Sequence, residues 1–253
     1  GQKEESMPDG SVDHVWEEHA QWWQDQFTDG VDPEYTEQII PLIIKHLPLR
    51  GSVLDVGAGE GQVARVAAEA GLRVTAVDPA WRQVSVGQER AGNVAWLQGS
   101  AMSLSFADAT FDAAVACLVF EHIADLDAAI SEVARVLKPG GRFLFLLNHP
   151  LLQTPGSGWI DDHILEEQYW RVGPYLPEAE TVEEVEKDVF ITFFHRPLGR
   201  YLNALHDAGL QLVRFEEPAP PQGFLDRAAE YFEAASIPRL LFLSLQKADT
   251  VTS

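Results

Sequence analysis

Cysteine and basic residues are both scarce in this chain of 253 residues. The one cysteine, Cys117, excludes an internal disulfide bond, and we take the reducing cytoplasm as the expected location. No apolar run approaches the length of a transmembrane helix, and no signal-peptide pattern opens the chain, so we expect no membrane partner. Only 18 lysines and arginines oppose 39 acidic residues, and a net charge of -21 would repel nucleic acids and anionic membrane surfaces.

Apolar residues are present in ordinary amount, and their share of 46% is enough for one sizeable core. We predict a single domain over residues 13–250, with a helical N-terminal cap over 13–48 and an insertion over 149–197. Residues 1–12 have no apolar periodicity, so we expect them to be disordered or a remnant of cloning.

Short apolar runs alternate with helical patterns from residue 52 onward. The alternation predicts an α/β fold: a doubly wound, Rossmann-like parallel sheet with helices on both faces. The predicted strands cover residues 52–57, 72–78, 94–99, 111–120, 142–148, 188–195, 210–218 and 239–246. The predicted helices cover 13–27, 33–47, 61–71, 197–209 and 223–236, and another begins at the N-cap Asp125 and stops at the Pro-Gly-Gly that starts at Pro139.

A glycine loop follows the first strand, in the stretch VLDVGAGEGQVAR. Such a loop lets the backbone approach a ligand closely, and the helix that follows adds N–H donors. The dinucleotide pattern wants its third glycine one position later, where Gln62 stands. Asp55 and Glu60 would repel a pyrophosphate but not a ligand with an ammonium and a sulfonium group. Asp78 ends the next strand, where an acid can accept both ribose hydroxyls.

These residues resemble the class I S-adenosylmethionine-dependent methyltransferases. LDVGAGEG is similar to their glycine motif and AVDPA to their second motif, and EVARVLKPGGRFLF resembles the helix, turn and fifth strand of the type 11 family. The resemblance covers residues 50–147. It implies a seven-stranded sheet whose last strand is antiparallel, S-adenosyl-L-methionine as the cofactor and S-adenosyl-L-homocysteine as the product.

The resemblance also implies a role for each residue of the motifs. Asp55 is expected near the methionine amino group of the cofactor, Asp78 on its ribose and Pro79 against its adenine. Ser100 stands where the family usually has an acid that accepts from the adenine amino group, so we expect backbone at Ala101 and Met102 to share that task. The remaining expected contacts are Gly57, Gly59 and Gly61 along the cofactor and the backbone of Cys117, whose thiol we expect to be inert.

Catalytic candidates follow from the position of ligands in open parallel sheets, beyond the carboxyl ends of the strands. Methyl transfer to a hydroxyl or a protonated amine needs a base as well as orientation. We predict that His149, after the fifth strand, and His195, in the family-like stretch HRPL, face the acceptor as catalytic residues. Glu121 and His122 follow the fourth strand, and for His122 we favour capping or packing.

Other conspicuous residues allow two interpretations each. The run from Asp161 to His163 resembles metal ligands, but consecutive side chains rarely converge on one ion, so we expect no metal. Tryptophans on the first predicted helix indicate either a packed helix or a lid over the site. Aromatic residues in the insertion would suit an acceptor pocket. The two sets are Trp16, Trp22 and Trp23, and Trp159, Tyr169, Trp170 and Tyr175.

The sequence therefore predicts a methyltransferase that uses S-adenosyl-L-methionine and acts on a small molecule, at oxygen or nitrogen rather than carbon. Two alternatives stay open: a cofactor-binding regulator without catalysis and, against the glycine spacing and Asp55, a nicotinamide-dependent oxidoreductase. Neither the acceptor nor the oligomeric state follows from the sequence.

Overall fold

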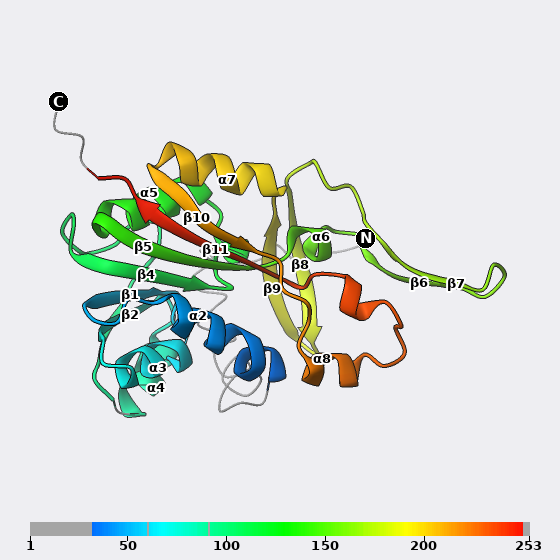
Figure 1. The fold of residues 1–253 in the computed structure, drawn as a ribbon, viewed down its shortest axis with the longest axis horizontal. Coiled ribbons are helices and arrows are strands. Elements are labelled where there is room, and N and C mark those ends of the chain that lie inside the picture. Colours follow the sequence, from blue (N-terminus) through cyan, green and yellow to red (C-terminus); the bar gives the residue numbers. More distant parts are fainter. Residues whose placement is uncertain (1–31, 60, 91, 250–253) are drawn as a thin grey trace, which may run out of the picture.

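A twisted sheet runs through the centre of the protein (Figure 1). The computed structural model describes residues 32–59, 61–90 and 92–249. These residues form a seven-stranded sheet in the order β10-β11-β5-β4-β1-β2-β3. β11 is antiparallel to both of its neighbours, and the other pairs are parallel, which confirms the predicted sheet and its antiparallel last strand. The strands are β1 (Ser52–Val56), β2 (Arg73–Asp78), β3 (Val94–Gln98), β4 (Phe111–Cys117), β5 (Leu137–Asn148), β10 (Leu210–Glu216) and β11 (Leu240–Lys247).

The central strands are apolar at successive positions because both faces of the sheet are covered. Along β1, Leu54 and Val56 join a core on one face, and Val53 joins a second core on the other. The first core is closed by α5 (Leu126–Val136) and α7 (Leu198–Asp207), and the second by α2 (Ile40–His46) and α3 (Gln62–Glu69). Figure 1 shows α4 (Trp81–Glu89) beside α3 on that second side.

The helix that leads into β1 has an irregular first half. Residues Tyr35–Ile39 form a π-helical turn, η1, and α2 follows with Pro41 in its first turn. Proline has no N–H for the regular helical hydrogen bond, and its ring clashes with the preceding turn, so a wider turn relieves both problems. Ile39 and Ile43 still reach the core at 2% and 1% exposure.

The segment between β5 and α7 contains two hairpins. After the short helix α6 (Pro150–Gln153), β6 (Gly158–Asp162) pairs with β7 (Glu167–Arg171), and this hairpin extends away from the sheet (Figure 1). β8 (Ala179–Glu186) then pairs with β9 (Val189–His195). The predicted strand at 188–195 is thus present, but it lies outside the main sheet.

The predicted helix over 223–236 is wrong in length. α8 covers Gln222–Arg227, and a 3-10 turn, η3, covers Ala234–Ser236. Ala228 leaves helical geometry at φ -111° and ψ 28°. In the second half only Ala234 is buried, and Phe232 is 89% exposed, so tertiary packing does not hold the whole segment helical.

Some predictions lie outside the described residues. They are the tail over 1–12, the helix over 13–27, and the proposed lid residues Trp16, Trp22 and Trp23. The domain boundaries stay predictions. Across the described ranges, every helix is too short or too polar to cross a bilayer.

Candidate active site

The glycine loop joins β1 to α3 in a conformation that glycine favours. Gly57, Gly59 and Gly61 have φ values of +67°, +58° and +98°. A Cβ on Gly57 would lie 2.6 Å from Val119, and a Cβ on Gly61 would lie 2.4 Å from the ring of Trp96. At Gly59, apart from its two chain neighbours, no atom of the described residues lies within 4 Å of the corresponding point, so no other described segment packs against the loop there.

Asp78, at the end of β2, holds this loop. One carboxylate oxygen accepts a hydrogen bond from the Gly59 N–H, and the other accepts from the Ala80 N–H, both at 2.9 Å. The side chain is 7% exposed. Asp78, which is predicted to bind a ribose, therefore also holds the backbone of the glycine loop at Gly59 and its own backbone turn at Ala80.

Asp55 is buried at the end of β1, at 2% exposure, and its Oδ2 has no hydrogen-bond partner among the described residues. Burial, and then the charge of Asp78, raise the pKa of Asp55 to about 8, against the opposing effect of the Ala64 N–H. A buried carboxyl without a partner is suited to bind a cationic group of a ligand, which would donate the missing hydrogen bond to Oδ2.

The loop after β3 carries the predicted adenine residues. Its start lies beside β2, because the Gly99 N–H donates to the Asp78 carbonyl at 3.1 Å. The Ser100 hydroxyl accepts from the Met102 N–H at 3.2 Å, so this hydroxyl shapes the turn. Ala101 and Met102 are half-buried and pack on the core. Pro79 is half-buried, and its carbonyl accepts from the Gln98 side chain at 3.0 Å.

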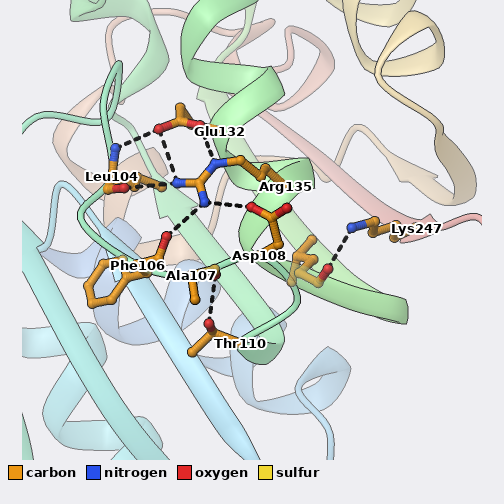
Figure 2. Close-up of polar contacts among 9 residues, drawn as sticks. Leu104, Phe106, Ala107, Asp108, Thr110, Glu132, Arg135 and Lys247 are labelled. Atoms are coloured by element: carbon orange, nitrogen blue, oxygen red, sulfur yellow. Dashed lines mark hydrogen bonds and ion pairs between the residues drawn. The ribbon is translucent and has the colours of Figure 1, made fainter.

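Arg135 of α5 fastens the end of the same loop (Figure 2). Its guanidinium donates to the carbonyls of Leu104 and Phe106 at 2.9 and 2.7 Å. It also pairs with Asp108 at 2.9 Å and with Glu132 at 2.6 Å. Glu132 in turn accepts from the Leu104 N–H at 2.8 Å. No local sequence pattern marks Arg135 for this role, because its partners lie up to 31 positions away.

Cys117 lies at the end of β4, where its Sγ is 3.8 Å from the Tyr35 hydroxyl. Burial raises the pKa of this thiol, which therefore stays protonated at neutral pH. The turn after β4 is η2 (Phe120–His122), and both Glu121 and His122 in it are buried. The Nδ1 of His122 donates to the Thr192 carbonyl at 2.8 Å, and burial lowers the pKa of His122 to about 4. The ring also packs on Phe193 at 4.6 Å, as expected of a packing histidine.

His149 caps the short helix α6 at the end of β5. Its Nδ1 accepts from the Leu151 N–H at 3.1 Å, so the ring proton is on Nε2, which donates to Glu217 at 2.5 Å. Both nitrogens are thus engaged within the protein, and the ring is 6% exposed.

His195 ends β9 and lies elsewhere. Its Nε2 is 2.7 Å from the Tyr175 carbonyl, and its buried Nδ1 has no partner among the described residues. It borders a surface pocket of about 580 Å³ that none of the predicted cofactor residues line. The two histidines share no hydrogen-bond partner among the described residues, and their catalytic role stays a prediction.

The neighbouring Arg196 was missed by the sequence analysis, although it stands in the stretch HRPL. At 4% exposure, it donates to the carbonyls of Phe120, Ile123 and Ala124. It thereby ties the end of β9 to the turn η2.

The aromatic residues of the insertion do not form one wall. Trp159 stacks on Tyr231 at 5.1 Å and meets Trp170 edge-on at 5.6 Å, within the hairpin that extends from the sheet. Tyr169 is 43% exposed, and the Tyr175 hydroxyl accepts from the Leu198 N–H. Asp161 and Asp162 end β6 and His163 begins the hairpin turn, where Asp162 accepts from the N–H groups of Ile164 and Leu165. Over the described ranges, no three potential metal-ligating side chains gather in one place.

Comparison with known proteins decides the family. A methyltransferase-domain model matches residues 54–145. The chain is 33% identical over 183 residues to the ubiquinone/menaquinone biosynthesis C-methyltransferase UbiE of Nitrobacter hamburgensis, covering 65% of this chain and 68% of that protein. It is 30% identical over 234 residues to the 27-O-demethylrifamycin SV methyltransferase of Amycolatopsis mediterranei, covering 88% of this chain and 78% of that protein.

The chain belongs to the class I S-adenosylmethionine-dependent methyltransferases. It is an enzyme of that class, and its cofactor is S-adenosyl-L-methionine. Not every match is long: a UbiE enzyme of Rubrivivax gelatinosus is 43% identical, but only 38% of its length is covered. A methyltransferase structure from Listeria monocytogenes has the same fold, with a TM-score of 0.72 at 24% identity over 83% of this chain and 96% of that one.

The geometry of this methyltransferase fits its cofactor. Asp55 has an unpartnered, buried oxygen where an ammonium group would neutralise its charge. No other described segment packs against the glycine loop at Gly59, and the Asp78 carboxylate lies at the edge of the loop. These features adjoin the carboxyl ends of β1 and β2, where open α/β sheets bind ligands.

Proposed function

We propose that this methyltransferase transfers the methyl group of S-adenosyl-L-methionine to an oxygen or nitrogen of a small organic molecule. When bound, the cofactor supplies a methyl group on a sulfonium, ready for displacement. The residues proposed to hold it are Asp55 for the amino group, Asp78 for the ribose and Pro79 for the adenine. The others are Gly57, Gly59, Gly61, Ser100, Ala101, Met102 and the backbone of Cys117.

The observation that carries the proposal is the unpartnered Asp55 carboxyl beside the glycine loop. Support for a small acceptor comes from the charge of -21, which opposes a nucleic-acid acceptor. Support for oxygen comes from the Amycolatopsis relative, which is named a methyltransferase of a 27-O-demethyl compound and whose match covers 88% of this chain. The UbiE relatives are named C-methyltransferases, so carbon is the alternative acceptor atom. The cytoplasm remains our proposed location, on the scarcity of cysteine.

The test is a screen with S-adenosyl-L-methionine labelled with ¹³C in its methyl group. The protein is incubated with a panel of phenols, hydroquinones, alcohols and amines, and with a metabolite extract. The ¹³C shift of the product separates O-methyl, N-methyl and C-methyl groups. We expect O- or N-methyl products. A C-methyl product would overturn the choice of atom, and no product from any source would overturn the choice of a small acceptor.

His149 and His195 remain our proposed catalytic residues, and the same screen provides their test. If either is the base, its replacement by alanine lowers turnover by about 10²-fold or more, with cofactor affinity nearly unchanged. For His149 to accept a proton, its Nδ1 must release the Leu151 N–H, because its Nε2 already carries the ring proton that it donates to Glu217. Variants that melt earlier but keep near-full turnover would show that both rings only cap or pack.

A further inference from the structure

Glu121 is a second buried acid without a partner. It lies in the turn η2 at 2% exposure, and neither of its carboxyl oxygens has a hydrogen-bond partner among the residues that the structure describes. Buried carboxyl groups are normally hydrogen-bonded, because an unpaired one loses its hydration without compensation. A group kept in this condition at a ligand-binding edge of a sheet is a candidate for contact with the ligand.

The surroundings of Glu121 are nearly all neutral or acidic. The charge of Glu121 raises the pKa of three neighbours: Tyr35 in η1, Cys117 in β4 and Tyr201 in α7. The Nε2 of His122 lies 3.8 Å from the Oε1 of Glu121. Arg196 lowers the pKa of Glu121, but its guanidinium is committed to the carbonyls of η2 and to Glu178. The backbone N–H groups of Asn148 and Glu121 also lower it, without reaching hydrogen-bond geometry. Burial outweighs all three and raises the pKa of Glu121 to about 8.

The position of Glu121 in the sheet separates it from the cofactor residues. Those residues adjoin β1, β2 and β3, except Cys117 at the end of β4. The groups that lower the pKa of Glu121 are its own N–H, the Asn148 N–H at the end of β5 and Arg196 after β9, and the turn η2 packs against β9 of the insertion. Glu121 thus lies on the side of the insertion, where an acceptor would enter. His122 is excluded from the same task, since its Nδ1 proton is given to Thr192 and the ring packs on Phe193.

We propose that Glu121 receives the polar hydrogen of the acceptor and acts as the general base of the methyl transfer. This inference rests on the proposed function and is the alternative to a base at His149 or His195: if it holds, the alanine variants of both histidines keep near-full turnover. The Glu121 carboxylate takes the proton of the acceptor hydroxyl or N–H group as the new bond to the methyl carbon forms and the carbon–sulfur bond breaks. S-Adenosyl-L-homocysteine is released, and the carboxyl returns the proton to water. The positive sulfonium of the bound cofactor favours the ionised carboxylate, so the base is formed when the cofactor is present.

The variants are Glu121→Gln, which keeps the size of the side chain, and Glu121→Asp, which keeps the acid but shortens it. Glu69→Gln, on the exposed surface of α3, is the matched control. Each is measured for melting temperature and for calorimetric binding of S-adenosyl-L-methionine and S-adenosyl-L-homocysteine. Single-turnover methyl transfer is measured with the phenol, alcohol or amine that the panel identifies. We expect Glu121→Gln to bind both cofactor forms within about threefold of wild type and to lose about 10²-fold or more in rate.

The pH profile gives a readout that a merely structural role would not change. Below the pKa of Glu121, the wild-type rate should fall about tenfold per pH unit, and the Glu121→Gln variant should lack that limb. Unchanged rates in Glu121→Gln at every pH would overturn the inference while leaving the proposed function intact. Loss of affinity for both S-adenosyl-L-methionine and S-adenosyl-L-homocysteine would also overturn it, because Glu121 would then belong to the cofactor site.

A second measurement needs no acceptor. Protein labelled with ¹³C at the glutamate carboxyl is titrated by NMR, and the Glu121→Gln spectrum identifies the signal of Glu121. We expect a midpoint well above that of an exposed glutamate, and a downward shift when S-adenosyl-L-methionine binds. A midpoint near 4, typical of a solvated carboxyl, would overturn the inference even if the panel yields no product.

Discussion

Asp55 should make both stability and cofactor binding depend on pH. In the free protein its pKa is raised from 3.8 to about 8, so the native state holds a proton that the unfolded chain loses between those values. The unfolding free energy should therefore fall as pH rises through this window, with the full stability present only below it. At pH 7 the penalty is of the order of 4 kcal/mol, from 1.36 kcal/mol for each tenfold difference in proton affinity.

A cationic group of the bound cofactor would lower the pKa of Asp55 again. Next to an ammonium group, Asp55 ionises, so binding at pH 6 to 7 should release up to one proton. Affinity for S-adenosyl-L-homocysteine should then rise about tenfold per pH unit up to about pH 8 and level off. Asp55→Asn should melt later than wild type at pH 7, bind S-adenosyl-L-homocysteine more weakly at pH 8, and lose this part of the proton release.

Calorimetry in two buffers with different ionisation enthalpies counts the released protons. The ligand's own amino group titrates alike in both proteins, so the difference between wild type and Asp55→Asn isolates the carboxyl. Equal proton release from the two proteins, or an Asp55→Asn variant that is no more stable than wild type at pH 7, would refute the reasoning.

Three further predictions concern the loops that adjoin Asp55. Asp78→Ala should weaken S-adenosyl-L-homocysteine binding at least tenfold by calorimetry, because charge-assisted hydrogen bonds are worth roughly 1.5–3 kcal/mol each; unchanged affinity would mean that Asp78 does not contact the cofactor. Arg135→Ala leaves the Leu104 and Phe106 carbonyls without their donor and should reduce the unfolding free energy by about 2–3 kcal/mol, seen as a fall in melting temperature of about 5 °C. A shift below about 1 °C would contradict the role of Arg135 in holding this loop. Gly57→Ala should destabilise more than Gly59→Ala in thermal melts, because both have positive φ but only the first would collide with Val119; the opposite order would show that Val119 moves aside.

The sheet and the glycine loop could be predicted because their signals are local. A strand buried on both faces is a continuous apolar run, and the strand–loop–helix that contains Asp55 lies within 18 residues, from Ser52 to Glu69. The length of the helix over 223–236 could not be predicted from its pattern. Its end depends on whether another surface covers Phe232, and no surface among the described residues does so.

The surroundings of the turn η2 were beyond the sequence for the same reason. Arg196 reaches η2 across more than 70 positions, and the isolation of Glu121 is a property of everything packed around it. The sequence directed attention to His149, but its engagement by Glu217 joins residues 68 positions apart. Such contacts are set by tertiary structure, and no spacing rule within a motif contains them.

The place of β11 has a consequence for how the protein is made. β11 lies between β5 and β10, although both precede it in the chain. During synthesis, the edge of β5 therefore stays unpaired until residues 240–247 emerge. Over the same interval β10 has no neighbouring strand in the sheet. At roughly 5–20 residues per second, this interval lasts several seconds, long enough for two nascent chains to pair edge to edge. The final strand thus acts as a late closing step, and a chain cut before it should aggregate rather than fold as a smaller sheet.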